Sequence, residues 1–185
     1  MVNIGRFAFY ECNLLAELFI PAEIEHIGRY AFWGTNDINL YFDEEEMPPY
    51  LDEYWDEGIR SYHMGVSEVI VDGDFKYALL NDGNISIVEY IGEGTEVDMN
   101  ALDLGGDIVA IGGKAFYLSD ITHVKLPETL VTIQAEAFAG SKLESAVIPA
   151  SVEFIGREAF FNCEIATLEF EDDSKLRVIE HDAFA

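Results

Sequence analysis

The sequence predicts a solenoid in which short strands and turns coil around one continuous core. Three observations support this prediction. The dipeptide Ala-Phe recurs six times, an isoleucine stands four residues before each alanine, and an alternating apolar pair follows every copy but the last. A repeat of this size cannot bury an apolar face alone, whereas stacked repeats form one shared core.

The Ala-Phe copies are in register with one another. Neighbouring copies are 22 to 24 residues apart, except that 84 residues separate Phe32 from Phe116. The copies are Ala8-Phe9, Ala31-Phe32, Ala115-Phe116, Ala137-Phe138, Ala159-Phe160 and Ala183-Phe184. The isoleucines before them are Ile4, Ile27, Ile111, Ile133, Ile155 and Ile179. These positions predict columns of apolar side chains stacked inside the coil.

An alternating apolar pair predicts one short strand in each unit, with one face buried. Proline ends three of these strands, at Pro21, Pro127 and Pro149, because it cannot donate to a sheet. The pairs are Leu18/Ile20, Leu40/Phe42, Val124/Leu126, Ala146/Ile148 and Leu168/Phe170. Strands one turn apart in a coil lie parallel.

A small polar side chain or a thiol stands three residues after each phenylalanine but the last. The column consists of Cys12, Thr35, Ser119, Ser141 and Cys163. Hydroxyl groups bond backbone atoms in tight turns, and a cysteine fits as a small weak donor. The two cysteines are therefore interpreted as turn residues and not as a redox pair, a disulfide framework or a zinc site.

The long gap is expected to hold two different elements. Proline at 48 and glycine at 58 bracket a predicted acidic helical cap over residues 43–58, with an acidic-aromatic docking patch as the alternative interpretation. Residues 66–71 read as a strand, and residues 75–80 and 85–90 as a hairpin across Asn81-Asp82-Gly83-Asn84. The expected domains are residues 1–74, a first array with two Ala-Phe units and the cap, and residues 75–185, a second array with four.

Composition limits the classes of partner. The 185 residues include 10 Lys and Arg against 36 Asp and Glu, a net charge of −26, yet 50% are hydrophobic. The apolar content indicates a folded chain. The charge argues against nucleic acid and anionic membrane surfaces. No apolar stretch has membrane-spanning length, and no signal peptide is recognised.

The outward-facing side chains of the strands form the candidate binding surface, because they alternate with the buried pairs and align across repeats. They are Glu17, Phe19, Asn39, Tyr41, His123, Lys125, Ser145, Val147, Thr167 and Glu169. Exposed Phe19, Tyr41 and Val147 would favour binding, although isolated apolar surface residues are common.

No catalytic constellation, metal site or cofactor motif is recognised. The acidic residues occupy repeat positions expected to face solvent, and the four histidines lack a serine or cysteine partner at a recognisable spacing. A hydrolase using paired carboxylates is kept as a distant alternative, because it would need two such groups across a cleft.

Residues 111–170 follow the pattern I-G-x-x-A-F-x-x-C/S/T-x-L-x-x-L-x-L-P almost column for column, and residues 4–42 follow it with one insertion. Residues 75–92 look like the hairpin that opens a new array. The pattern resembles the BspA-type leucine-rich repeat. The resemblance implies an α/β protein with a right-handed leucine-rich-repeat solenoid, rich in short parallel strands and turns with little helix. Family members are mostly secreted or cell-surface proteins of bacteria, several associated with adhesion.

The expected function is therefore a non-catalytic binding module for a protein ligand, such as a host extracellular-matrix or cell-surface protein. A structural spacer in a long repeat protein is the alternative. Since the sequence begins inside a unit and stops after an Ala-Phe, we also expect a fragment of a longer repeat protein, with end-to-end self-association through its uncovered ends.

Overall fold

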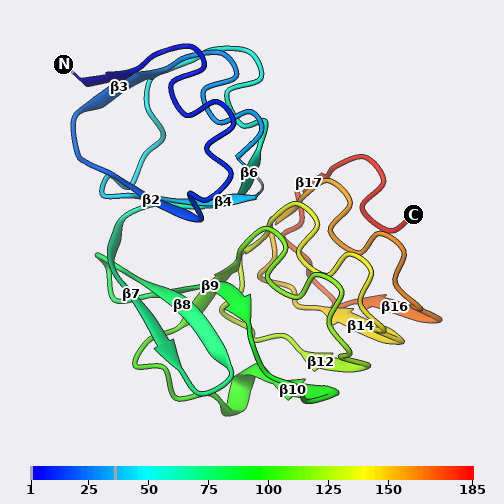
Figure 1. Ribbon diagram of the computed structural model, residues 1–185. Coiled ribbons are helices and arrows are strands. Elements are labelled where there is room, and N and C mark those ends of the chain that lie inside the picture. Colours follow the sequence, from blue (N-terminus) through cyan, green and yellow to red (C-terminus); the bar gives the residue numbers. More distant parts are fainter. Residues whose placement is uncertain (1, 36) are drawn as a thin grey trace. The chain divides into compact units, whose positions relative to one another are not determined.

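The computed structural model describes residues 2–35 and 37–185, which divide by their contacts into a first unit up to Ser67 and a second unit from Glu68. In the first unit, two strands come from each turn of the chain, and they build two parallel three-stranded sheets, β1-β3-β5 and β2-β4-β6 (Figure 1). The strands are β1 (Val2–Ile4), β2 (Glu17–Ile20), β3 (Ile24–Ile27), β4 (Ile38–Phe42), β5 (Tyr50–Leu51) and β6 (Ile59–His63).

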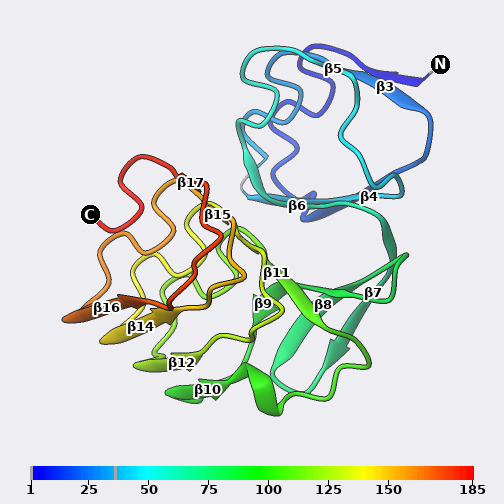
Figure 2. The same ribbon diagram turned by 180° about the vertical axis from the view of Figure 1, so that it is seen from behind.

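The second unit repeats this plan with longer sheets. One sheet has the order β10-β12-β14-β16, and the other has the order β17-β15-β13-β11-β9-β8-β7 (Figure 2). The strands are β7 (Val66–Asp72), β8 (Phe75–Leu80), β9 (Ile85–Tyr90), β10 (Glu96–Asp98), β11 (Ile108–Ile111), β12 (His123–Lys125), β13 (Thr132–Ile133), β14 (Ser145–Ile148), β15 (Phe154–Ile155), β16 (Thr167–Phe170) and β17 (Val178–Ile179).

The predicted strands and hairpin are confirmed, with one correction. β8 and β9 pair antiparallel across residues 81–84, where Gly83 has a φ of 85°. The expected single strand per unit is wrong, since each turn contributes two. The second strand contains the isoleucine six residues after each proline, which is Ile27, Ile133 or Ile155.

The predicted helical cap over residues 43–58 is wrong. This segment makes another turn of the solenoid, with β5 pairing to β3 and β6 to β4. The repeat is hidden in the sequence because Trp55 and Asp56 stand where the other turns have Ala-Phe. Trp55 packs against the core of the first unit in place of the alanine.

The second unit contains an interior aromatic ladder along the solenoid. Phe116, Phe138 and Phe160 are fully buried, and their rings stack nearly parallel with centroids 4.9 and 5.0 Å apart. Tyr90 and Phe184 extend the ladder at 5.3 and 5.0 Å. The Ala-Phe column is thus the core, as the sequence predicts, and Tyr90 fills the phenylalanine position of a further turn.

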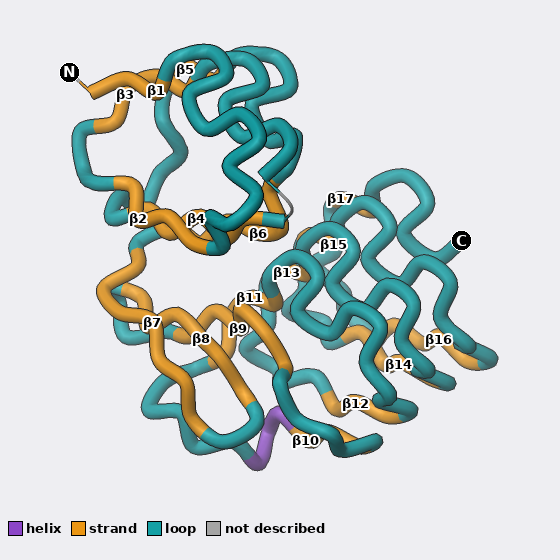
Figure 3. The backbone as a smooth tube through the Cα atoms, viewed as in Figure 1, coloured by secondary structure: helices purple, strands orange, loops and turns teal. Residues whose placement is uncertain are grey.

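Helix is almost absent. The described residues contain one 3-10 turn, η1 (Met99–Ala101), and the chain is otherwise strands and turns (Figure 3). The protein is a β-solenoid. The expected α/β class is therefore wrong in its helical component, since η1 is the one helical element in the described residues. No helix in the described part of the chain is long and apolar enough to span a membrane.

The turns after the Ile column repeat the same backbone at two positions. Three residues after each column isoleucine, or after Leu51 in the hidden turn, φ lies between 55° and 60°. This position, here called the outer column, holds Phe7, Tyr30, Tyr54, Lys114, Glu136, Glu158 and Asp182. A second left-handed residue follows four positions later, as at Gly34 and Gly58. Glycine is not needed at the outer column, so its side chains are free to vary.

The small polar column lies in these turns as expected. Thr35 Oγ1 lies 2.6 Å from the carbonyl oxygen of Phe32 and 2.9 Å from that of Gly58, and its single proton is shared between these two acceptors. Cys163 Sγ lies 3.1 Å from the carbonyl oxygen of Phe138, and burial raises the pKa of its thiol. Both cysteines are free thiols.

Candidate functional site

The predicted strand face is well formed in the second unit. Parallel pairing brings His123, Ser145 and Thr167 into one row, and it pairs Val147 with Glu169 in the next row. Of these five side chains, only Ser145 is half-buried, and the others are exposed. Val147 is 49% exposed, so an apolar side chain lies in the middle of a polar surface.

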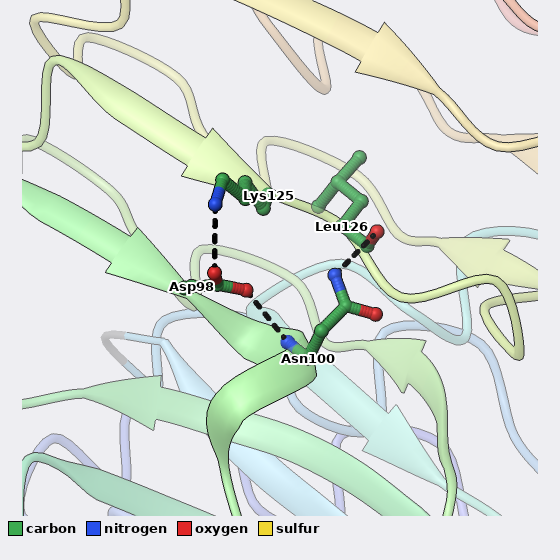
Figure 4. Close-up of polar contacts among 4 residues, drawn as sticks. All are labelled: Asp98, Asn100, Lys125 and Leu126. Atoms are coloured by element: carbon green, nitrogen blue, oxygen red, sulfur yellow. Dashed lines mark hydrogen bonds and ion pairs between the residues drawn. The ribbon is translucent and has the colours of Figure 1, made fainter.

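Lys125 is fixed at one edge of this face. Its ammonium nitrogen lies 2.9 Å from a carboxylate oxygen of Asp98, which lowers the pKa of Asp98 and raises the pKa of Lys125 (Figure 4). Asp98 also accepts a hydrogen bond from the backbone of Asn100, whose amide group donates to the carbonyl of Leu126 at 3.4 Å. These contacts hold β10, η1 and β12 together.

A hollow of about 310 Å³ opens beside Lys125 and Val147. Apolar side chains and a few charged groups line it together, which is the usual composition of a site for a peptide or small group. Its lining consists of Asn100, Val124, Lys125, Leu126, Glu128, Val147, Pro149 and Glu171.

The strand face of the first unit differs from the prediction. Phe19 is exposed, at 57%, but Tyr41 and Asn39 are buried, which corrects their expected exposure. β4 is the central strand of its sheet, so the ring of Tyr41 has neighbours on both sides, Phe19 at 4.9 Å and His63 at 5.6 Å. The Tyr41 hydroxyl donates to Glu17 at 3.1 Å.

Asn39 belongs to a buried polar chain on the same sheet. Ser61 Oγ donates to Asn39 Oδ1 at 2.8 Å and lies 2.8 Å from His63 Nε2. Burial lowers the pKa of His63 to about 3, because the charged imidazolium would lose its hydration. These residues contribute to structure and do not offer an open surface.

The structure reveals a surface that the sequence prediction missed. Five rings gather on the turns of the first unit and are here called the aromatic cluster: Phe7, Tyr10, Tyr30, Trp33 and Tyr54. Four of them are exposed and Tyr30 is half-buried. A signal was available, since aromatic residues recur three and six residues after Ile4 and Ile27.

Cations and carboxylates surround the aromatic cluster. The Arg6 guanidinium lies 4.7 Å from the Phe7 ring centre, and that of Arg29 lies 4.9 and 5.0 Å from Tyr30 and Tyr54. Glu53 forms an ion pair with Arg29 at 3.8 Å, and it raises the pKa of Tyr54. The cluster therefore combines aromatic surface with a charged rim, as protein interfaces do.

One group of side chains among the described residues has the composition of a metal site. Glu158, His181 and Asp182 bring potential ligand atoms within 4.8 Å of one another. Arg157 lies 4.0 Å from Glu158 and competes for its carboxylate, and the other two residues are exposed.

The carboxyl groups with a displaced pKa are not poised as general acids. Hydrogen bonds from His26 and from the backbone of Arg29 lower the pKa of Asp52. The pKa of Asp98 is lowered as well. A general acid requires the opposite displacement.

Comparison with solved structures finds bacterial repeat proteins. The pneumococcal vaccine antigen PcpA is 22% identical with a TM-score of 0.51, over 65% of this chain and 42% of that chain. A leucine-rich repeat protein of Bacteroides capillosus is 25% identical with a TM-score of 0.40, over 56% of this chain and 98% of that chain. The first of these likenesses supports the fold. No curated protein sequence matches the chain.

A family model matches the chain over residues 1–47 and 75–185, in six copies. The unmatched segment contains the hidden turn formed by β5 and β6, in which Trp55 and Asp56 replace Ala-Phe. The family is described as the BspA type leucine rich repeat region. The chain belongs to this family of leucine-rich repeat proteins.

Proposed function

We propose that the chain is a non-catalytic, protein-binding module of a bacterial surface or secreted protein. The observation that carries the proposal is the strand face of the second unit. Side chains from β12, β14 and β16 align in rows there, beside a hollow with apolar and charged walls. A rigid, repeated backbone holds the rows, so that a partner meets a surface with little conformational freedom left to lose.

Val147 is the expected anchor of this surface. It is exposed between the polar rows and also lines the hollow, so a partner side chain in the hollow would cover it. Lys125, held by Asp98, supplies a positive charge at the same edge. Host extracellular-matrix or cell-surface proteins are the partners we propose, from the character of the family.

A binding assay with purified matrix proteins and the whole chain tests this function. Val147→Asp and Lys125→Glu should each weaken binding at least about tenfold, as expected for residues at the centre of an interface. Val131→Asp is the matched control, since Val131 is a similarly exposed valine next to β13 in the other sheet. Equal binding by all variants, or no binding to any protein, would leave the structural spacer as the better description.

A further inference from the structure

The aromatic cluster of the first unit is a second candidate surface, independent of the strand face. Its rings come from three successive turns and contact one another along the solenoid, with Tyr30 stacked between Phe7 at 5.7 Å and Tyr54 at 5.3 Å. Trp33 is half exposed and lies 5.2 Å from Tyr30 and 5.8 Å from Tyr10. Contiguous exposed aromatic surface of this kind is uncommon unless it is used.

Folding alone does not require these rings. The same outer column in the second unit consists of Lys114, Glu136, Glu158 and Asp182, with φ values equal to those of the aromatic residues within a few degrees. There the column is joined by ion pairs, such as Lys114 to Glu136 at 3.6 Å. The core of the first unit lies inside, where Phe9 and Phe32 stack at 5.4 Å. The same turn backbone therefore accepts either aromatic or charged side chains at the outer column. The backbone conformation does not explain why the first unit has aromatic residues there.

Charge identifies the kind of partner. Residues 1–67 contain 13 Asp and Glu against 3 Lys and Arg, and two of the carboxylates contact rings of the cluster, Glu11 at Tyr10 and Glu53 at Tyr54. A second copy of this chain, also carrying a net charge of −26, would be repelled. A basic partner would be attracted to the surface and steered toward it.

The rings already bind cations of the required type. Arg6 and Arg29 lie over the faces of Phe7, Tyr30 and Tyr54 in cation–π contacts. Within residues 2–35 and 37–185, the cation–π contacts to the cluster do not include Trp33, although tryptophan gives the strongest interaction of this type. Both faces of Tyr30 are covered by stacked neighbours, so Tyr30 itself offers no ring face to a ligand.

We propose that the aromatic cluster docks an arginine-rich or lysine-rich segment of a partner protein. A guanidinium or ammonium group of the segment lies against Trp33, and its neighbours along the segment pair with Glu11 and Glu53 at the rim. Trp, Tyr and Arg are also the residues that contribute most to binding at measured interfaces.

The test uses the whole chain and a fluorescent eight-residue peptide of alternating Arg and Gly, with an alternating Glu and Gly peptide as the negative probe. Trp33→Ala should weaken binding of the basic peptide at least about tenfold, and Trp33→Phe should restore most of it. Tyr117→Ala is the matched control, because Tyr117 is an exposed ring at the same turn position in the second unit. Circular dichroism confirms that each variant is folded.

Three results would overturn the proposal. If Trp33→Ala binds the basic peptide as well as the parent, or if Tyr117→Ala weakens binding equally, then general charge attraction explains the affinity. If a soluble β-glucan binds in a Trp33-dependent manner and the basic peptide does not, the cluster is a saccharide site. A Tyr54→Ser variant gives a second measurement, since it removes a ring of the cluster and leaves Trp33 in place.

Discussion

The two units build the same turns and place opposite chemistry on them. In the first unit the outer column is Phe7, Tyr30 and Tyr54, joined by stacking and by Arg29. In the second unit the column is charged, and Glu136 forms ion pairs with Lys114 and Arg157 at 3.6 and 3.8 Å. The backbone angles agree, so the turn geometry does not depend on which side chains occupy it.

Their cores differ in length. The interior ladder of the second unit has five stacked rings, whereas in the first unit Phe9 and Phe32 form one stacked pair, and Asp56 stands at the next phenylalanine position. A repeat protein gains stability from contacts between neighbouring turns. The first unit therefore gains less stability from ring stacking in its core than the second unit does.

The largest expected effect comes from breaking the interior ladder. Phe138→Ala should lower the free energy of unfolding by ~4 kcal/mol, because it leaves a cavity and removes two ring contacts. Phe32→Ala removes one stacked contact, and its effect should be smaller by ~1 kcal/mol. Urea denaturation followed by circular dichroism measures both. An effect of Phe32→Ala equal to or above that of Phe138→Ala would contradict the comparison.

Gly58 tests the backbone of the hidden turn. A Cβ atom at Gly58 would lie 2.2 Å from the carbonyl oxygen of Phe32, and its φ is 95°. Gly58→Ala should therefore destabilise the first unit by at least ~2 kcal/mol, from strain and steric overlap. Gly34→Ala is the matched variant, because its nearest neighbour is the flexible side chain of Glu11 at 3.2 Å and the cost is lower. Tryptophan fluorescence during urea denaturation measures both, since Trp33 and Trp55 lie in this unit.

His63 tests the buried strand face of the first unit through the pH dependence of stability. The pKa of His63 is about 3 in the fold and near 6.5 when unfolded, so the unfolded chain binds the extra proton between these values. Stability that is full above pH 6.5 should fall toward pH 3 by up to ~1.4 kcal/mol per pH unit. His63→Gln should flatten this dependence, as followed by thermal unfolding from pH 7 to pH 5. If the parent and His63→Gln lose stability equally as the pH falls, the pH dependence does not come from His63.

The smallest expected effects concern the outer columns. Tyr30→Ser should cost ~1 kcal/mol of unfolding free energy, with little dependence on salt, because stacking is not screened. Glu136→Gln should cost less than ~1 kcal/mol, and the difference from the parent should shrink at high salt. Denaturation at two salt concentrations compares them. Matching salt dependences would mean that both columns act through the same interaction.

The repeat architecture is predictable because its core positions are chemically distinctive. Ala and Phe recur side by side, and proline marks the ends of β2 and β14. The turn at residues 50–58 escapes the pattern because Trp55 satisfies the packing that Ala provides elsewhere. The left-handed turn positions could not be predicted either. Tyr30 and Glu136 adopt a positive φ that is usual for glycine and asparagine and rare for other residues.

The candidate surfaces were only partly predictable. Alternation identifies which strand residues point outward, and Val147 and Glu169 are exposed as expected. It does not say what covers them, so the burial of Tyr41 and Asn39 required the structure. The aromatic cluster depends on which turn residues meet between neighbouring coils, and this depends on the repeat register across the hidden turn.

The outer column places one side chain on each of seven turns at nearly the same backbone angle. The ring centroids of Tyr30 and Tyr54, on neighbouring turns, are 5.3 Å apart, and each further turn adds one outer-column side chain with the same backbone geometry. Gain or loss of one repeat unit would therefore shift the order of the outer-column side chains by one turn without requiring a different turn backbone.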